Sequence, residues 1–385
     1  MTPKQRMLAA YRGLPLDAVP VAPEFWYYIP AKLLGVDMTT FERQVPLWEA
    51  LQRTFRHYGT EGWAIVGPHV PTEGVRTREE WIDLGGGRHE SRVTIDTPHG
   101  TLTRRHLYDA AEPSWPLERP LKTFERDWPA YKATAMGDVA SADWTGVQRA
   151  LNAVGEDYLL EVAVGGPFFD FIATGREGGL PQAVFDLAEH GRFFEELHEE
   201  YVEHVRALVR GAFEQTSADA AFIGCCWSCP SLIGPGLWRR WDEPVIRAAA
   251  EEAHRAGKLL HVHIHGRCRE IIDDIARCGA DCVCPFERPP GGDITDLRAI
   301  RAALQGCVAM NGNVHTVETL IRGGPEDVVR EVEAVFEQWG APPTRLILGT
   351  GDQVGGDTPD GNIIALIDSG RRLGRAAAEA AWPEP

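Results

Sequence analysis

The sequence predicts an α/β protein, specifically a (β/α)8 TIM-like barrel with antiparallel hairpins inserted into its N-terminal third. Three observations support this prediction. From residue 157 onward, apolar runs of strand length alternate with helical segments. These runs are almost unbroken, which is typical of parallel strands buried on both faces. Six such units follow one another, and with a further strand near the N-terminus they favour a closed barrel over an open sheet.

The N-terminal elements are more varied. Residues 3–13 predict a short amphipathic helix, the run VPVAPEFW predicts a strand that leads into an aromatic-rich loop, and the periodicity of residues 43–59 predicts a helix. Between residues 60 and about 125, polar and apolar residues alternate around Gly and Pro turns. This pattern predicts antiparallel hairpins, inserted at about residues 70–110.

The C-terminal elements follow a regular order. The predicted strands are 157–167, 218–225, 258–265, 280–286, 306–313 and 344–351, and the predicted helices are 182–216, 238–256, 268–278, 294–304, 316–339 and 361–374. Active sites of such barrels lie at the carboxyl ends of the strands. Polar residues that follow these strands are therefore expected to converge on one opening.

Length and composition limit the function. We expect residues 1–385 to form a single barrel domain, and the net charge of −17 argues against binding to nucleic acids or anionic membranes. No apolar run approaches the roughly 18 residues that a membrane span needs, and the N-terminus lacks the pattern of a signal peptide. A cytoplasmic location is expected, in which the eight cysteines are reduced thiols.

The run LLHVHIHG, residues 259–266, places a histidine at every second position. Side chains alternate faces along a strand, so His261, His263 and His265 share one face. His261 lies deepest in the run and is interpreted as a core residue. His263 and His265 stand at the end of the strand, where two imidazoles indicate a metal or substrate site.

Several segments resemble the uroporphyrinogen decarboxylase superfamily. They include GADCVCPFERPPGGD, MNGNVHTVETLIRGGPEDVVREV and LILGTGDQVGGDTPDGNIIALIDSGRRLG, together with the opening KQRMLAAYRGLPLDAVPVAP and the run VGGPFFDFIATG. True uroporphyrinogen decarboxylases have an arginine-rich segment after the first strand. Here that stretch is PEFWYYIPAK, in which Lys32 is the only cation. The resemblance is therefore closer to the branch that transfers methyl groups between corrinoids and thiols.

The resemblance implies a ligand set for a metal. In the thiol-methyltransferase branch, zinc is bound by a His-x-Cys segment and a later cysteine, and the matching positions here are His263, His265 and Asp352. Two nitrogens and one oxygen suit zinc with an open coordination position, and they also suit iron or manganese.

Other residues at the strand ends are candidates for substrate binding and catalysis. Glu287 and Asp352 are the expected catalytic groups, with Glu287 as a general base or as a partner of a histidine. Cys225 or Cys226 could supply a further ligand or line the pocket. The expected substrate-binding residues are Trp26, Tyr28, Cys225, Trp227 and Asn311.

Together these observations predict a zinc-dependent methyltransferase that handles a small methylated or corrinoid-bound methyl donor. The expected partners are a small-molecule substrate and a corrinoid protein, and a homo-oligomer is left open. Two alternative functions remain, decarboxylation of uroporphyrinogen or another carboxylate, and metal-dependent hydrolase or lyase chemistry. A non-catalytic corrinoid- or metal-binding accessory protein is a third alternative.

Overall fold

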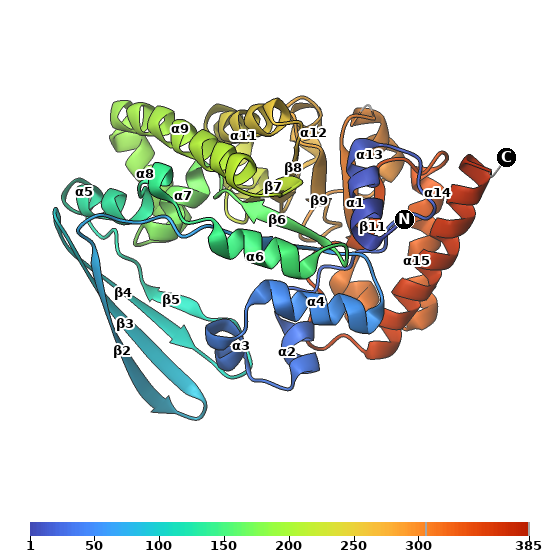
Figure 1. Cartoon of the computed structure of the whole chain (residues 1–385), viewed down its shortest axis with the longest axis horizontal. Coiled ribbons are helices and arrows are strands. Elements are labelled where there is room, and N and C mark those ends of the chain that lie inside the picture. Colours follow the sequence, from blue (N-terminus) through green and yellow to red (C-terminus); the bar gives the residue numbers. More distant parts are fainter. Residues whose placement is uncertain (305, 384–385) are drawn as a thin grey trace.

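A seven-stranded parallel sheet forms the centre of the protein, in a computed structural model that describes residues 1–304 and 306–383 (Figure 1). Neighbouring strands in the sheet follow the order of the chain, as in a barrel. The strands are β1 (Trp63–Val66), β6 (Leu159–Ala163), β7 (Ala220–Cys225), β8 (Leu259–Ile264), β9 (Cys282–Pro285), β10 (Ala309–Val314) and β11 (Leu346–Thr350).

The segment around Val21 adds an eighth position beside β11. Val21 pairs in parallel with Leu348, and the Ala22 N–H donates to the Leu348 carbonyl at 2.8 Å. The Val21 N–H donates at 2.9 Å to the carboxylate of Glu61, which lies two residues before β1 begins. One side chain thus links the two edges of the curled sheet, and the predicted TIM-like barrel is confirmed.

Residues 19–26, predicted as a strand, form less strand pairing than expected. Pro20 and Pro23 flank the paired residues, and proline has no backbone N–H to donate to a neighbouring strand. The segment therefore makes a single bridge at Val21 and continues as irregular chain toward the barrel opening.

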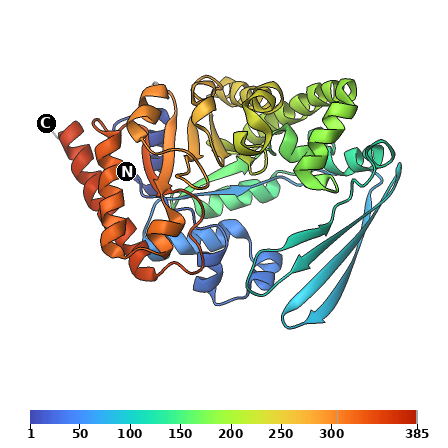
Figure 2. The same ribbon diagram turned by 180° about the vertical axis from the view of Figure 1, so that it is seen from behind.

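Helices lie around the sheet and beyond its ends (Figures 1 and 2). They are α1 (Pro3–Arg12), α2 (Tyr28–Leu34), α3 (Met38–Gln44), α4 (Leu47–Tyr58), α5 (Phe124–Ala135), α6 (Thr145–Val154), α7 (Phe168–Gly175), α8 (Gly179–Glu189), α9 (Gly191–Gln215), α10 (Pro230–Leu237), α11 (Glu243–Arg255), α12 (Ile272–Ile275), α13 (Leu297–Ala303), α14 (Pro325–Trp339) and α15 (Asp360–Ala381). Helix α1 contacts β6, β10 and β11, and its Met7 and Tyr11 pack against the first residues of several barrel strands.

Three predicted helices are interrupted in the structure. Residues 43–59 contain a break at Pro46, because the residue before a proline avoids the helical region, and Val45 is extended. Residues 182–216 break at His190, where α8 ends. Residues 316–339 break at the Gly323–Gly324–Pro325 turn, so only α14 is a regular helix and residues Thr316–Ile321 form a π-helical turn.

An antiparallel sheet of four strands, here called the appended sheet, projects from the barrel (Figures 1 and 2). Its strands are β2 (Arg76–Gly85), β3 (Arg88–Thr97), β4 (Gly100–Tyr108) and β5 (Trp115–Glu118). One face carries Val93, Ile95 and Leu102, which belong to the main hydrophobic core. The predicted hairpin region is confirmed.

Two further properties follow from the described residues. None of the helices they form is long and apolar enough to cross a membrane. No disulfide joins the cysteines among the described residues.

Candidate functional site

Strand β8 brings three histidines onto one face, and each has a different environment. His261 is 0% exposed. Its Nδ1 lies 2.8 Å from a Glu161 carboxylate oxygen and 3.1 Å from the Tyr11 hydroxyl, while its Nε2 lies 3.1 Å from Cys284 Sγ. Both nitrogens therefore have partners inside the barrel, and His261 is a core residue.

His263 lies two residues after His261 in β8, closer to the carboxyl end of the strand. Its Nδ1 is 3.0 Å from Cys284 Sγ, and its Nε2 is 2.6 Å from the Nε2 of His265. Burial, together with the neighbouring imidazoles of His265 and His261, lowers the pKa of His263 well below its usual range. This imidazole is neutral at pH 7 and keeps a lone pair for a ligand or a proton.

Glu287 fixes the ring of His265. One of its carboxylate oxygens lies 2.9 Å from His265 Nδ1, and the other accepts the Gly266 N–H at 2.6 Å. Gly266 has a φ of 78°, and a Cβ there would lie 2.4 Å from Ser231 Oγ, so this turn requires glycine. Burial opposes the charged imidazolium, yet the hydrogen bond with Glu287 and the nearby carboxylates raise the pKa of His265 to about 9.

Two more carboxylates face the histidines. Burial and the neighbouring charge of Asp352 raise the pKa of Glu24 to about 8. Glu24 is held by its backbone N–H, which donates to Thr350 Oγ1 at 3.1 Å, and by the indole N–H of Trp26, which donates to its carboxylate. Burial also raises the pKa of Asp352, whose carboxylate accepts the Gln353 N–H at 2.6 Å.

These side chains form two sets of possible metal ligands among the described residues. In one set the donor atoms of Glu24, His263 and Cys284 lie within 4.8 Å of one another, and in the other those of His265, Glu287 and Asp352 do. The contact between His263 and His265 joins the two sets. Of the three ligands expected from the sequence, His263 falls in the first set, and His265 and Asp352 fall in the second.

Glu24 and Cys284 are site residues to which the sequence analysis gave no role. Cys284 is the third residue of β9 and lies beside His263 in the register of the sheet. Glu24 lies between apolar residues in the run VPVAPEFW. An acidic residue in such a run is unusual, and this is the sequence feature that could have indicated a functional role.

The predicted substrate-binding residues lie in different environments. Trp26 is half-buried and packs edge-on against Trp63. The Tyr28 hydroxyl donates to Glu112 at 2.6 Å. Trp227 is 37% exposed, whereas Asn311 is buried, and its side-chain oxygen lies 2.2 Å from where a Cβ on Gly349 would be.

Cys225 and Cys226 face different environments. Cys225 is fully buried in the main core, and Cys226 is exposed. Burial and the carboxylates of Asp170, Glu24 and Asp352 raise the pKa of Cys226 to about 12. The Cys226 thiol is therefore protonated at pH 7.

Comparisons with known proteins were made for the sequence and the fold. Residues 146–373 match the family described as uroporphyrinogen decarboxylase (URO-D). No curated protein matches the sequence. A methyltransferase from Methanosarcina mazei superposes with a TM-score of 0.66 at 17% identity, covering 97% of this chain and 99% of that chain.

Other solved structures superpose weakly. A prolidase complexed with N-methylphosphonate-L-proline gives a TM-score of 0.28 at 20% identity, with 47% of this chain and 44% of that chain covered. A dipeptide epimerase from Methylococcus capsulatus complexed with Mg ion gives 0.23 at 13% identity, with 80% and 86% covered.

Proposed function

The chain belongs to the uroporphyrinogen decarboxylase family, and from this premise we propose that it is a metal-dependent methyltransferase. The proposed donor is a small methylated compound or a corrinoid-bound methyl group, which a corrinoid protein would present. The observation that supports metal dependence best is the approach of His263 Nε2 to His265 Nε2, at 2.6 Å. The fold shared with the M. mazei methyltransferase is compatible with this proposal.

The contacts of the two histidines fit a shared cation. Each Nδ1 already has a partner, Cys284 Sγ for His263 and the Glu287 carboxylate for His265. With a pKa of about 9, His265 carries a hydrogen on each nitrogen at pH 7, so its Nε2–H donates to the Nε2 lone pair of His263, and a metal ion could take the place of that hydrogen. Two lone pairs at this distance repel unless a proton or a metal ion lies between them.

We propose His263, His265 and Asp352 as the metal ligands. Imidazole nitrogens and a carboxylate suit zinc, and they also suit iron or manganese. Glu287 orients His265 through Nδ1, as carboxylates commonly do beside metal-binding histidines. A metal held there would supply Lewis acidity, which lowers the pKa of a thiol acceptor or polarises a bound carbonyl.

The remaining residues would handle protons and position the substrate. Glu24 has a pKa of about 8 and therefore holds a proton at pH 7, facing the opening. We propose Asp352 and Glu287 as the catalytic groups that act on the methyl acceptor. Trp26, Tyr28 and Trp227 would form the walls of the substrate site. In the transfer, the acceptor thiol loses its proton and its sulfur forms the new bond to the methyl carbon. The donor keeps the electron pair of the broken bond.

The charge of the opening disfavours uroporphyrinogen as the substrate. Glu287 and Asp352 lie beside His265, and Lys32, the cation of the segment PEFWYYIPAK, is 3.1 Å from Asp360. A substrate with many carboxylates would meet acidic groups at this position. Methyl transfer involves no such charge conflict.

Metal analysis of protein purified without a histidine tag tests the proposal. We expect bound zinc, iron or manganese in the parent, and loss of most of it in His263→Ala and in His265→Ala. His99→Ala, which removes an exposed histidine of the appended sheet, is the matched control and should keep the metal. Methyl transfer from methylcobalamin to a thiol should fall in parallel. Full methyl transfer by metal-free protein would contradict metal dependence.

A further inference from the structure

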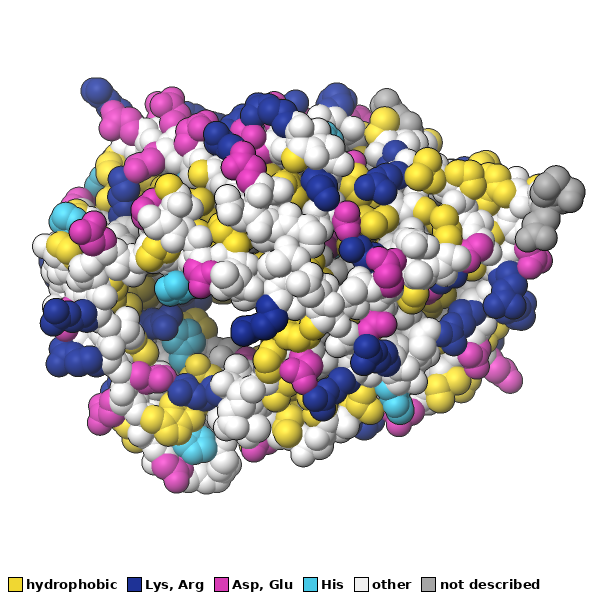
Figure 3. Space-filling view, in the orientation of Figure 1, with side chains coloured by type: hydrophobic (Ala, Val, Ile, Leu, Met, Phe, Trp, Pro, Cys, Tyr) yellow, Lys and Arg dark blue, Asp and Glu magenta, His cyan; other side chains and the backbone are white. Residues whose placement is uncertain are grey.

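A group of basic side chains lies on the face of the appended sheet that turns toward the barrel. Arg104 and His106 share one face of β4 with Leu102, because the three residues are two positions apart. Leu102 is part of the main core. Arg119 follows β5 directly. A hollow opens between the appended sheet and the rest of the molecule, and Lys or Arg and His side chains are visible in it (Figure 3).

These three basic residues line a cavity of about 290 Å³. Its other walls come from the barrel side and from the loop before α5, and they include Trp227, Tyr131, Thr174 and Pro120. The volume is near the lower end of the range for small-molecule sites, about 300 Å³. The cavity is therefore large enough for one end of a small ligand.

The two arginines of this cavity have no carboxylate partner. Among the described residues, neither Arg104 nor Arg119 has a carboxylate oxygen within 4.0 Å of its guanidinium, although the chain is strongly acidic. On the opposite face of the sheet, Arg92 and Arg105 both pair with Glu90, at 2.5 and 2.7 Å. The cavity thus concentrates cations that the protein itself does not neutralise.

Arg119 also has an unused donor inside the protein. Its Nε atom is buried and has no hydrogen-bond partner. The carboxylate of Glu177 lies nearby but accepts the backbone N–H of Arg119, at 2.6 Å. An unsatisfied buried donor is costly, so the Arg119 side chain is held here without a protein acceptor for Nε.

The basic groups also repel one another. Burial and the charges of Arg104 and Arg119 lower the pKa of His106. A neutral His106 can still donate one hydrogen bond to a ligand. An anion placed among the three groups would offset the repulsion between the two guanidinium groups.

The walls of the cavity favour a ligand with an apolar body. The Arg119 guanidinium carbon lies 5.3 Å from the centre of the Trp227 ring. The Asp170 carboxylate accepts the N–H groups of Trp227 and Ser228, at 3.0 and 2.8 Å, and so holds this loop in place. The ring and the guanidinium offer an apolar surface beside the cations.

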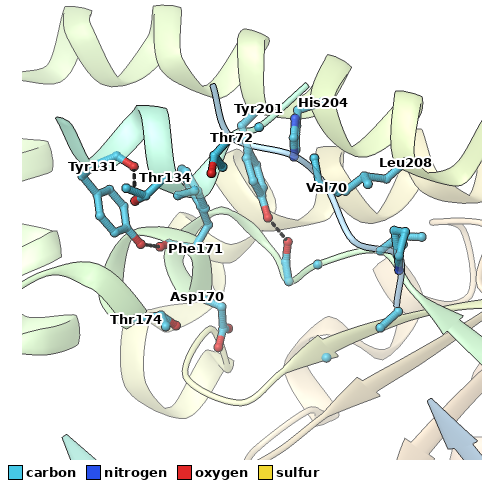
Figure 4. A pocket seen from close by; sticks show the side chains of 18 residues that line it. Val70, Thr72, Tyr131, Thr134, Asp170, Phe171, Thr174, Tyr201, His204 and Leu208 are labelled. Carbon is cyan, nitrogen blue, oxygen red and sulfur yellow. Dashed lines mark hydrogen bonds between the residues drawn. The ribbon is translucent and has the colours of Figure 1, made fainter. Parts of the chain in front are cut away.

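The cavity borders a larger one and lies beside the residue Cys226. Tyr131 and Thr174 also line a cavity of about 450 Å³ beside the ends of β6 and β7, where the Tyr201 hydroxyl donates to the Gly166 carbonyl at 2.8 Å (Figure 4). On the other side, Trp227 directly follows Cys226. The charges of Glu24 and Asp352 contribute to the raised pKa of the Cys226 thiol. Trp227 is therefore the wall of the cavity that is next in the chain to a residue within electrostatic range of Glu24 and Asp352.

We infer that this cavity binds the carboxylate of a small organic acid with an aromatic or other apolar body, and that this acid is the substrate of the methyl-transfer site proposed above. Arg104 and Arg119 would hold the carboxylate, and Trp227 would contact the apolar body. The inference rests on the proposed function for the identity of the ligand as substrate. The binding of the carboxylate depends only on the cavity.

Isothermal titration calorimetry with benzoate, and with benzamide as its neutral counterpart, tests the inference on the full chain. We expect millimolar binding of benzoate and at least about tenfold weaker binding of benzamide. Arg119→Gln and Arg104→Gln should each weaken benzoate binding about tenfold. Arg104 is exposed, so its replacement leaves the fold intact. Arg92→Gln, on the opposite face of the same sheet, is the matched control and should bind benzoate like the parent.

A metal ion at the histidines could also bind the carboxylate of benzoate. A further variant distinguishes this site from the cavity lined by Arg104 and Arg119. His265→Ala should bind benzoate like the parent if the carboxylate lies at the arginines. Loss of benzoate binding in His265→Ala but not in Arg119→Gln would overturn the inference while leaving the metal site standing. Absence of benzoate binding in the parent, or equal binding of benzoate and benzamide, would also overturn it.

Discussion

His263 Nε2 and His265 Nε2 lie 2.6 Å apart at the end of β8, and each ring is held by a partner on its other nitrogen. The two residues are separated by one position, so the alternation of the strand turns both rings to the same side. Cys284 and Glu287 then set the direction of each ring. The result is a pair of nitrogens that converge on one point, which is suitable for a proton or a metal ion.

Replacing Glu287 should weaken metal binding without removing a proposed ligand. In Glu287→Gln the charged partner of His265 Nδ1 is lost, so the ring is less basic and less firmly oriented. We expect metal affinity to fall about 10–100-fold, the usual effect of losing such a partner. Competition with a chelator measures this affinity. Glu318→Gln, which changes an exposed glutamate paired with Arg322, should leave it unchanged.

The histidine pair was predictable because the chemistry lies in one strand. The spacing in LLHVHIHG fixes which side chains share a face, whatever the rest of the chain does. Glu24 was not predictable in the same way, since its position depends on the bridge between Val21 and Leu348 and on its hydrogen bond to Thr350. A contact between distant segments cannot be derived from local periodicity.

The same distinction applies to the fold. The apolar runs of β6 to β11 predict buried parallel strands, because burial on both faces requires apolar residues at consecutive positions. The break at Pro46 could have been predicted, because the residue before a proline avoids the helical region. The break at His190 has no comparable signal, as the hydrophobic pattern runs on from α8 into α9 and only Gly191 follows.

Glu61 should be important for stability because it links the two edges of the sheet. It is buried, accepts the Val21 N–H at 2.9 Å, and pairs with Arg6. In Glu61→Ala, the buried Val21 N–H loses its partner, and Arg6 keeps only its pair with Asp17. We expect the free energy of unfolding to fall by about 2–3 kcal/mol.

Urea unfolding of Glu61→Ala and the parent measures this loss. The matched control is Glu49→Ala, which removes an exposed ion pair with Arg53 on α4 and should cost less than about 0.5 kcal/mol. Equal stability of the two variants would show that Glu61 does not join the edges of the sheet in solution.

The appended sheet should make stability sensitive to acid through Glu90. Hydrogen bonds with Arg105 and Arg92 lower the pKa of Glu90 to about 2, whereas an unfolded glutamate has a pKa of about 4.3. A carboxylate with a lowered pKa stabilises the folded state above the unfolded value, and this contribution disappears as the pH falls from about 4.3 to about 2. Glu90→Gln should therefore be less stable than the parent at neutral pH.

The difference between Glu90→Gln and the parent should shrink as the pH falls through this range. Denaturant unfolding at neutral pH and at about pH 3 measures the change. Glu80→Gln is the control, because Glu80 is exposed on β2 and has no ion pair within 4.0 Å among the described residues. A constant difference at every pH would mean that the charge of Glu90 contributes nothing.

Asp352 should determine which metal the opening holds. Its carboxylate is the one proposed anionic ligand. Burial together with the charge of Glu287 raises the pKa of Asp352, which means that the ionised carboxylate is destabilised in the folded protein. A bound cation would remove this destabilisation. Asp352→Ala should lose most of the metal and the methyl transfer that depends on it. Its stability without metal should stay within about 0.5 kcal/mol of the parent, because a carboxylate at the opening contributes little packing.

Asp352→Cys should keep zinc, because a thiolate is a softer ligand that zinc accepts, and should bind iron or manganese less well than the parent does. Elemental analysis of the two variants and the parent, with thermal unfolding of each, makes the comparison. Asp357→Ala changes an exposed aspartate in the same loop and should match the parent in both measurements. If Asp352→Ala retains all of its metal and activity, the third ligand lies elsewhere, and Glu24, Cys284 and Cys226 are the side chains whose replacement should then remove the metal.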